Sequence, residues 1–233
     1  MKIITSIAIM LIISSFTSAQ NLDEIIAKHI EAVGGADNWA KIKTMKMEGI
    51  MKVQGMDIQI TMLQVDKTAM RQNITAMGMT GYSIVTATEG WRYMPFQGQT
   101  KPEPITADEL KISQVQLYIL DAFITYKELG KTIEYLGTED IEGTECHKIK
   151  MVDKNELETT YFMDPDNYLV IKQISKGKLN GQEFENAQSI SNYKKLDEGI
   201  LYPMNISGGF GGIEIQKIEI NIPIADTEFK ITE

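Results

Sequence analysis

Histidine and cysteine are the side chains best suited to nucleophilic and metal chemistry, and this chain holds few of them. Among its 233 residues are one cysteine, Cys146, and two histidines, His29 and His147. Cys146 and His147 are adjacent on a predicted strand, where neighbouring side chains point to opposite faces, so a thiolate–imidazolium pair is disfavoured. His29 falls near the apolar face of a predicted helix, a position typical of a structural histidine. This set argues against a transition-metal site, and a lone cysteine excludes an internal disulfide.

Two other motifs are candidate ion-binding sites. Asp164 and Asp166 flank a proline in a predicted turn, but they lack the regular ligand spacing of a calcium loop. The glycine-rich stretch 208–212 has no Lys-Ser/Thr pair or helix after it, so it predicts a hairpin tip and not a phosphate cradle. We therefore expect no catalytic residue, no metal and no cofactor.

Methionine gives a more informative pattern. Nine of the fourteen methionines lie between Met45 and Met94, on predicted strands whose other face is polar. The unbranched methionine side chain fills irregular space and adapts to variable ligands. Two interpretations follow: a loosely packed core beneath helices, or a deformable cavity that holds an acyl chain. The residues alone favour the core.

The first nineteen residues have the organisation of a signal peptide. Lys2 precedes an apolar run over residues 3–13, and Thr17-Ser18-Ala19 forms a small-x-small cleavage site. This run is too short to cross roughly 30 Å of hydrocarbon, and we expect no membrane-spanning segment in the exported chain, residues 20–233. The net charge of −9 argues against a nucleic-acid partner, which would need a basic surface.

The periodicity of the remaining chain predicts a helix, strands, a second helix and more strands. Apolar residues recur at helical spacing from Leu22 to Val33, and Gly34-Gly35 ends that helix. From Met45 the period changes to two, which predicts strands up to about residue 95. Thr106 and Glu109 fit a capping box for a helix that continues to about Phe123.

About seven antiparallel strands are predicted between residues 132 and 222. Near Gln216-Lys217 the isoleucines change parity, which predicts a β-bulge. Strands at hairpin spacing without alternating helices favour an α+β, mainly β fold, with one large curved antiparallel sheet. We expect the helices to cover its concave apolar face, within a single domain over residues 20–233.

Several short motifs resemble the LolA family of periplasmic lipoprotein carriers. The segment Gly90-Trp91-Arg92-Tyr93-Met94-Pro95-Phe96 resembles the end of a strand and the loop after it in that family. The opening, residues 30–45, is similar to that of LolA-like exported proteins of Bacteroidetes-type bacteria. The likeness runs over nearly the whole exported chain, and the order of elements carries it more than any single motif. Further matching segments are Tyr161–Pro165, Tyr168–Val170, Ser191–Tyr193, Ile222-Pro223 and Phe229–Ile231.

This resemblance implies a half-closed β-barrel in which helices form a lid over a hydrophobic cavity. In that family the cavity receives lipoprotein acyl chains from an inner-membrane transporter and passes them to an outer-membrane acceptor, without covalent chemistry. An arginine near the start of the third strand holds the lid there. The nearest cation here is Lys67, which lacks the forked guanidinium. The predicted cavity residues are Met47, Met51, Ile58, Ile60, Met62, Met70, Trp91, Phe96, Leu117 and Leu120.

The leading interpretation is thus a monomeric periplasmic carrier of lipoprotein acyl chains or another lipid. A second is a protein-binding regulator on the same fold, resembling the RseB-type envelope-stress sensors. Those sensors have a second domain after the LolA-like one, whereas this sequence ends at Glu233. A secreted hydrolase is the weakest, because no nucleophile–base pair or metal set supports it.

Overall fold

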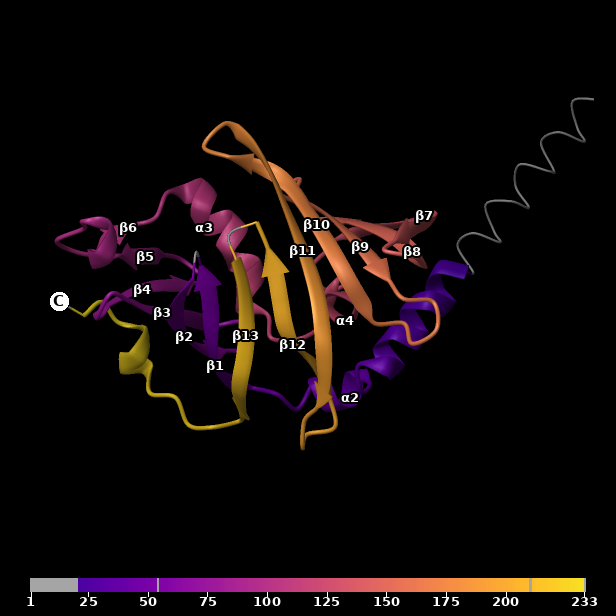
Figure 1. Cartoon of the computed structure of the whole chain (residues 1–233), viewed down its shortest axis with the longest axis horizontal. Helices are drawn as coiled ribbons and strands as arrows, with labels where there is room; N and C mark the ends of the chain where they lie inside the picture. The colour runs from indigo at the N-terminus through magenta and orange to yellow at the C-terminus, as the bar shows by residue number, and fades with distance from the viewer. Residues whose placement is uncertain (1–20, 54, 210, 233) are drawn as a thin grey trace, which may run out of the picture.

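The computed structural model describes residues 21–53, 55–209 and 211–232, so the predicted signal peptide lies outside the described residues. Within these ranges thirteen strands form one antiparallel sheet, in the order β6-β5-β4-β3-β2-β1-β13-β12-β11-β10-β9-β8-β7. The sheet curves strongly but does not close, and β6 and β7 are its two edges (Figure 1). The prediction of a mainly β half-barrel with helices on the concave face is confirmed.

The first half of the sheet contains the methionine-rich strands. Met47 lies opposite Met62, and Met51 lies opposite Ile58, so these side chains share the concave face. Lys46 has the opposite parity along β1 and points outward, as does Leu63, with which it pairs. The strands are β1 Thr44–Val53, β2 Met56–Val65, β3 Ala69–Ala76, β4 Met79–Thr86, β5 Gly90–Tyr93 and the two-residue β6 Glu103–Pro104.

The second half begins at the far edge and ends beside β1. Its strands are β7 Thr132–Ile141, β8 Thr144–Val152, β9 Glu158–Met163, β10 Val170–Leu179, β11 Gln182–Lys195, β12 Leu201–Gly208 and β13 Gly211–Ile220. Glu48 of β1 pairs with Lys217 while Gly49 pairs with Ile215, which leaves Gln216 as an extra residue. The predicted β-bulge is therefore confirmed.

The α-helices lie on the concave side of the sheet (Figure 1). Residues 21–32 are helical, and Gly34 and Gly35 follow with φ of 104° and 84°. At Gly34 a side chain is also excluded by space, because an added Cβ would lie 2.3 Å from the Gly199 carbonyl oxygen. The other helices are α2 Ala36–Trp39, α3 Ala107–Ser113 and α4 Ala122–Thr125, with 3₁₀ turns η1 Pro95–Gln97, η2 Gln114–Leu117 and η3 Asp226–Phe229. None of the described helices is long and apolar enough to cross a membrane.

The predicted continuous helix from Thr106 to Phe123 is wrong in one respect. Its start is confirmed, because the Thr106 hydroxyl accepts from the Glu109 N–H and the Glu109 carboxylate accepts from the Thr106 N–H. The chain then becomes extended at Tyr118, and a new helix starts after Asp121, whose carboxylate caps it. Contacts from the sheet, described below, replace the helical hydrogen bonds over this stretch.

The core consists of three clusters that each join a helical segment to the concave face. The first combines helix 21–32 and α4 with β8–β10, the second α2 with β1, and the third η2 with β3 and β4. Full burial of one large apolar side chain contributes roughly 1.5–3 kcal/mol. Central members are Ile25, Phe123, Ile149 and Met163 in the first, Trp39, Ile42, Met45 and Ile200 in the second, and Met70, Val85 and Leu117 in the third.

The C-terminal residues 226–232 lie against the outer face of β3 and β4 (Figure 1). Arg71, only 8% exposed, donates to the backbone carbonyls of Glu228 and Lys230 at 2.9 and 3.3 Å. Its guanidinium lies 4.4 Å from the ring centre of Tyr82, whose hydroxyl donates to the Thr232 carbonyl at 2.7 Å. These contacts cover part of the convex side of the half-barrel.

Candidate functional site

Residues 107–125, which comprise α3, η2 and α4, cross the concave face and are called the lid segment below. The end of β2 and the turn between β2 and β3 hold its middle by three hydrogen bonds. The Gln64 side-chain amide donates to the Gln116 carbonyl at 2.6 Å, and the Lys67 N–H donates to the Leu117 carbonyl at 2.7 Å. The Asp66 carboxylate accepts from the Ile119 N–H at 3.1 Å. These bonds fix the extended stretch at the point where the helix breaks.

Lys67, predicted to control the lid, is in contact with it. Besides its backbone bond, its ammonium pairs with the Glu128 carboxylate at 2.5 Å and lies 5.8 Å from the ring centre of Tyr118. Both charged side chains are largely exposed, so the ion pair contributes at most about 1 kcal/mol. Control of the lid by Lys67 stays a prediction.

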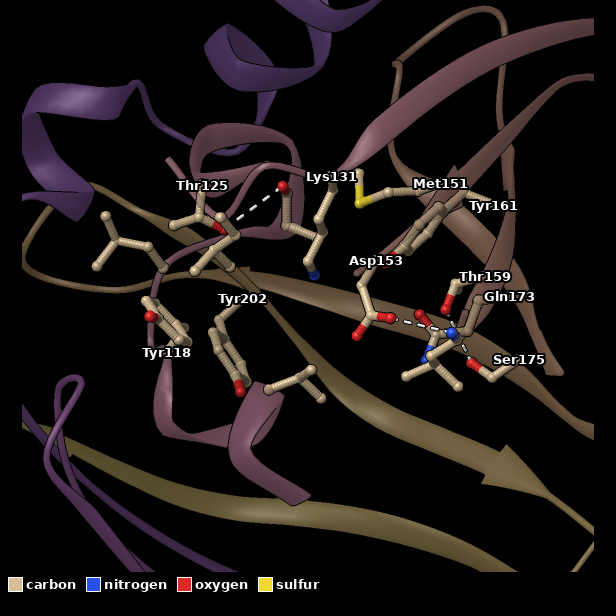
Figure 2. A pocket seen from close by; sticks show the side chains of 15 residues that line it. Tyr118, Thr125, Lys131, Met151, Asp153, Thr159, Tyr161, Gln173, Ser175 and Tyr202 are labelled. Atoms are coloured by element: carbon tan, nitrogen blue, oxygen red, sulfur yellow. Dashed lines mark hydrogen bonds between the residues drawn. The ribbon is translucent and has the colours of Figure 1, made fainter. Parts of the chain in front are cut away.

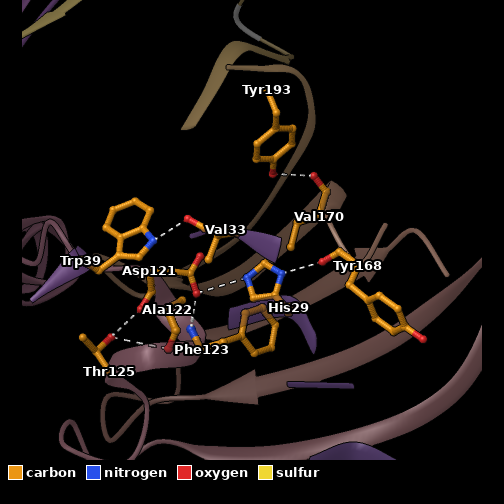
Figure 3. Close-up of polar contacts among 10 residues, drawn as sticks. All are labelled: His29, Val33, Trp39, Asp121, Ala122, Phe123, Thr125, Tyr168, Val170 and Tyr193. Atoms are coloured by element: carbon orange, nitrogen blue, oxygen red, sulfur yellow. Dashed lines mark hydrogen bonds and ion pairs between the residues drawn. The ribbon is translucent and has the colours of Figure 1, made fainter. Parts of the chain in front are cut away.

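His29 joins the lid segment to the first helix and to the β9–β10 turn (Figure 3). It is 1% exposed, its Nδ1 lies 2.7 Å from the Tyr168 carbonyl oxygen, and its Nε2 lies 3.3 Å from the Asp121 carboxylate. Burial alone would lower the pKa of His29, but the Asp121 carboxylate and the Tyr168 carbonyl together raise it above its ordinary value. The structural position predicted for this histidine is confirmed.

Three adjacent cavities lie along residues 114–125 of the lid segment. The largest, about 420 Å³, separates the lid segment from β8–β10 and is shown in Figure 2. It shares Tyr118 and Lys131 with an outer cavity of about 180 Å³, and Ala122 and Tyr202 with an inner cavity of about 220 Å³. Because each neighbour shares wall residues with the largest one, we treat the three as compartments of a single lid groove.

The wall of the lid groove combines apolar and polar side chains. Leu120 and Met151 face the same compartment as Thr159 and Gln173 (Figure 2). The Thr159 hydroxyl lies 3.2 Å from the Ser175 hydroxyl. Burial raises the pKa of Tyr202 to about 12 and also raises that of Tyr161, so both phenols stay protonated at neutral pH. The groove can therefore accept an apolar chain and also groups that form hydrogen bonds.

The predicted cavity residues separate into two groups. Leu120 lines the largest compartment, and Leu117 and Lys67 line the outer one. The predicted methionines and isoleucines of β1–β3 share the concave face but do not line these three compartments; Met62 and Met70 instead pack with Leu117. Among the methionines of this region, Met56, Met77 and Met79 are exposed near hairpin turns.

Trp91 and Phe96, predicted together at the cavity edge, lie on different faces of the sheet. Trp91 pairs with Ile84, which pairs with Arg71, so all three belong to the outer face. Phe96 covers Gly81 on the concave face, where an added Cβ would lie 2.9 Å from the phenylalanine ring. Strand register, which the sequence does not determine, separates these two residues.

Sequence reasoning missed several groove residues, including Lys131, Asp153, Thr159 and Gln173. The inward polar residues of β9 and β10 alternate with others along their strands, a pattern typical of a solvent-facing row. The signal for Lys131 was weak as well, since it simply follows Gly130 at the start of a strand. Only the crossing lid segment makes these side chains part of a groove.

The other candidate sites are occupied by structural contacts. Cys146 is buried, whereas His147 packs against Tyr168 with ring centres 5.9 Å apart. The Asp164 carboxylate accepts from the N–H groups of Asp166 and Asn167, as in a capped turn. Within the part of the chain that the structure describes, no three His, Cys, Asp or Glu side chains cluster as metal ligands.

No model of a known protein family and no curated protein sequence matches this chain. Solved structures do match its backbone. A LolA superfamily protein from Nitrosomonas europaea matches at 10% identity and a TM-score of 0.57, covering 89% of this chain and 96% of its own. A domain assigned as an outer membrane lipoprotein-sorting protein from Vibrio parahaemolyticus matches at 12% identity and a TM-score of 0.54, covering 88% and 94%.

A DUF1329 family protein from Desulfovibrio piger is similar to the same extent, with 12% identity, a TM-score of 0.52 and coverage of 89% and 96%. At such identities the likeness concerns the fold. The chain has the LolA-like fold that its motifs predicted.

Proposed function

We propose that this LolA-like half-barrel binds the acyl chains of lipoproteins, or a similar hydrophobic ligand, in the lid groove. The observation that supports the proposal best is the groove itself, whose largest compartment measures about 420 Å³ beneath the lid segment. In this proposal the chain is exported to the periplasm and carries its ligand between an inner-membrane transporter and an outer-membrane acceptor. No bond is made or broken in the ligand.

The energetics of the lid suit a carrier that must also release its ligand. Burial of an acyl chain contributes about 0.8 kcal/mol for each CH₂ group, which is large for a whole chain. The hydrogen bonds that hold the middle of the lid contribute only about 1 kcal/mol each. A partner that stabilises the open lid can therefore shift the affinity strongly by changing a few contacts.

The proposal is tested by ligand binding to protein purified from the periplasm of a bacterium that expresses the full chain. We expect native mass spectrometry to detect a bound lipid, and a fluorescent fatty acyl probe to bind the delipidated protein. Ser175→Phe places a ring in the largest compartment, which Ser175 lines, and should weaken probe binding at least tenfold.

Ser189→Phe is the matched control, because Ser189 is exposed on the neighbouring strand and faces away from the groove with Lys172. It should leave probe binding unchanged. Protein that is always free of lipid and does not take up the probe contradicts the proposed function. Equal loss in both variants contradicts the lid groove as the binding site.

A further inference from the structure

The outer compartment of the lid groove carries a concentration of positive charge. Four lysines from four separate segments line it, whereas Asp153 is the one acidic residue in its wall. The chain as a whole has a net charge of −9, so the sign of the charge is reversed locally at this mouth. The four are Lys67 in the β2–β3 turn, Lys111 on α3, Lys131 before β7 and Lys154 in the β8–β9 turn.

Two of these lysines already have acidic partners. Lys67 pairs with Glu128, and the Lys111 ammonium lies 3.8 Å from the Asp108 carboxylate. Lys131 and Lys154 form no ion pair with any described residue. The Asp153 carboxylate is itself engaged, since it accepts from the N–H groups of Asn155 and Leu157.

Lys131 is the lysine that connects the charged mouth to the deeper groove. It lines both the outer and the largest compartments, and its ammonium points into the pocket (Figure 2). Burial lowers the pKa of Lys131, an effect that the nearby Asp153 charge offsets only in part. A partly desolvated cation with no ion-pair partner is unfavourable until a counter-charge arrives.

The outer compartment is lined by four lysines, whereas the largest compartment has one of them, Lys131, beside a wall of mixed apolar and polar side chains. Tyr118, Val115 and Leu129 form the common wall between them. Beyond this wall the largest compartment offers Leu120, Met151 and Leu157. An anion at the mouth would thus place an attached acyl chain directly along the apolar side of the groove.

We propose that the ligand of the lid groove is an anionic amphiphile, whose carboxylate or phosphate head group binds Lys131 and Lys154 at the outer compartment. This inference rests on the proposed acyl-binding function and adds the chemistry of the head group. Lysine recognises either anion as a point charge, so the lysines alone do not distinguish a fatty acid from a phospholipid.

The test compares three probes that share one acyl chain: oleate, oleoyl-lysophosphatidylglycerol and the neutral oleyl alcohol, each below its micelle concentration. Wild-type protein should bind the better of the two anions at least tenfold more tightly than the alcohol. Lys131→Met should remove most of that preference and leave alcohol binding within about twofold. Whichever anion binds more tightly identifies the carboxylate or the phosphate source.

Lys52→Met is the control, since Lys52 is exposed on β1 and lies outside the groove. Lys131→Gln, with a measured unfolding midpoint for each variant, separates lost charge from lost folding. If wild-type protein binds all three probes equally, or if both Lys131 variants fold and keep the anion preference, the head-group proposal is wrong while acyl binding stands. If no probe binds, the proposed function fails as well.

Discussion

At the scale of single residues, His29 is a buried side chain whose protonation is coupled to folding. It contacts Asp121 and the Tyr168 carbonyl, and these contacts raise its pKa above the ordinary value. The folded protein therefore binds the His29 proton more tightly than the unfolded chain does. This contribution to stability is fully present below the unfolded pKa of about 6.5 and is lost as the pH rises through the folded pKa.

We expect His29→Gln to lower the free energy of unfolding by about 2 kcal/mol at pH 5.5, because the Asp121 carboxylate loses its charged partner. At pH 9 the loss should be clearly smaller. Urea unfolding followed by circular dichroism across this range measures the difference. An identical loss at both pH values would show that the His29 charge contributes nothing.

His147 supplies the matched comparison, since burial and the Lys28 charge lower its pKa. Its effect has the opposite sign: stability that is present above pH 6.5 is lost as the pH falls. His147→Gln should therefore remove part of the acid-side loss of stability and leave the change at higher pH, which belongs to His29.

Residue positions were predictable from the sequence only where the pattern itself contains the information. The structural position of His29 followed from the helical periodicity of the apolar residues around it. The face occupied by Trp91 did not, because a change of one residue in register exchanges the two faces of a strand. Gln173 and Ser175 are inward polar residues, which no strand pattern distinguishes from exposed ones.

At the scale of elements, the β2–β3 turn determines the shape of the lid. The Asp66 carboxylate holds the Ile119 N–H at the extended stretch between η2 and α4. Asp66→Ala should speed hydrogen exchange at the Ile119 amide about fivefold, which corresponds to the loss of about 1 kcal/mol. Exchange monitored by nuclear magnetic resonance measures this effect.

Asp57→Ala is the control for that experiment, because Asp57 is exposed near the start of β2, whereas Asp66 follows the end of that strand. Its substitution should leave exchange in the lid segment unchanged. If Asp66→Ala also leaves the Ile119 amide equally protected, the β2–β3 turn does not hold the lid.

Strands such as β1 and β2 were predictable because apolar and polar residues alternate along them, and the bulge at Gln216 because it interrupts such an alternation. The break in the lid helix was not, since the hydrogen-bond partners at Asp66 and Lys67 are far from it in sequence. The two-residue strand β6 lies in a loop rich in proline and glycine, where only its pairing with β5 creates a strand.

At the scale of the whole molecule, residues 226–232 cover part of the outer face of the sheet and bury Arg71 there. Arg71 donates to the carbonyls of Glu228 and Lys230 and is buried, whereas the other arginine, Arg92, forms an exposed pair with Glu109. Arg71→Met should lower the free energy of unfolding by about 2 kcal/mol, because several hydrogen bonds to a charged group are lost.

Arg92→Met removes the same type of side chain from an exposed pair and should cost less than about 1 kcal/mol. Urea denaturation of both variants at one pH gives the comparison. Equal losses would mean that residues 226–232 do not contribute to stability through Arg71.

The position of β1 beside β13 has a consequence for the order in which the chain can fold. Met45, near the start of the described chain, pairs with Ile220, near its end. The backbone groups on that side of β1 therefore have no native partner until the final strand is available, and such distant pairing makes folding slow. During biosynthesis the first half-sheet must wait with an open edge. Until β13 pairs with it, that edge needs protection from pairing with the strands of other chains.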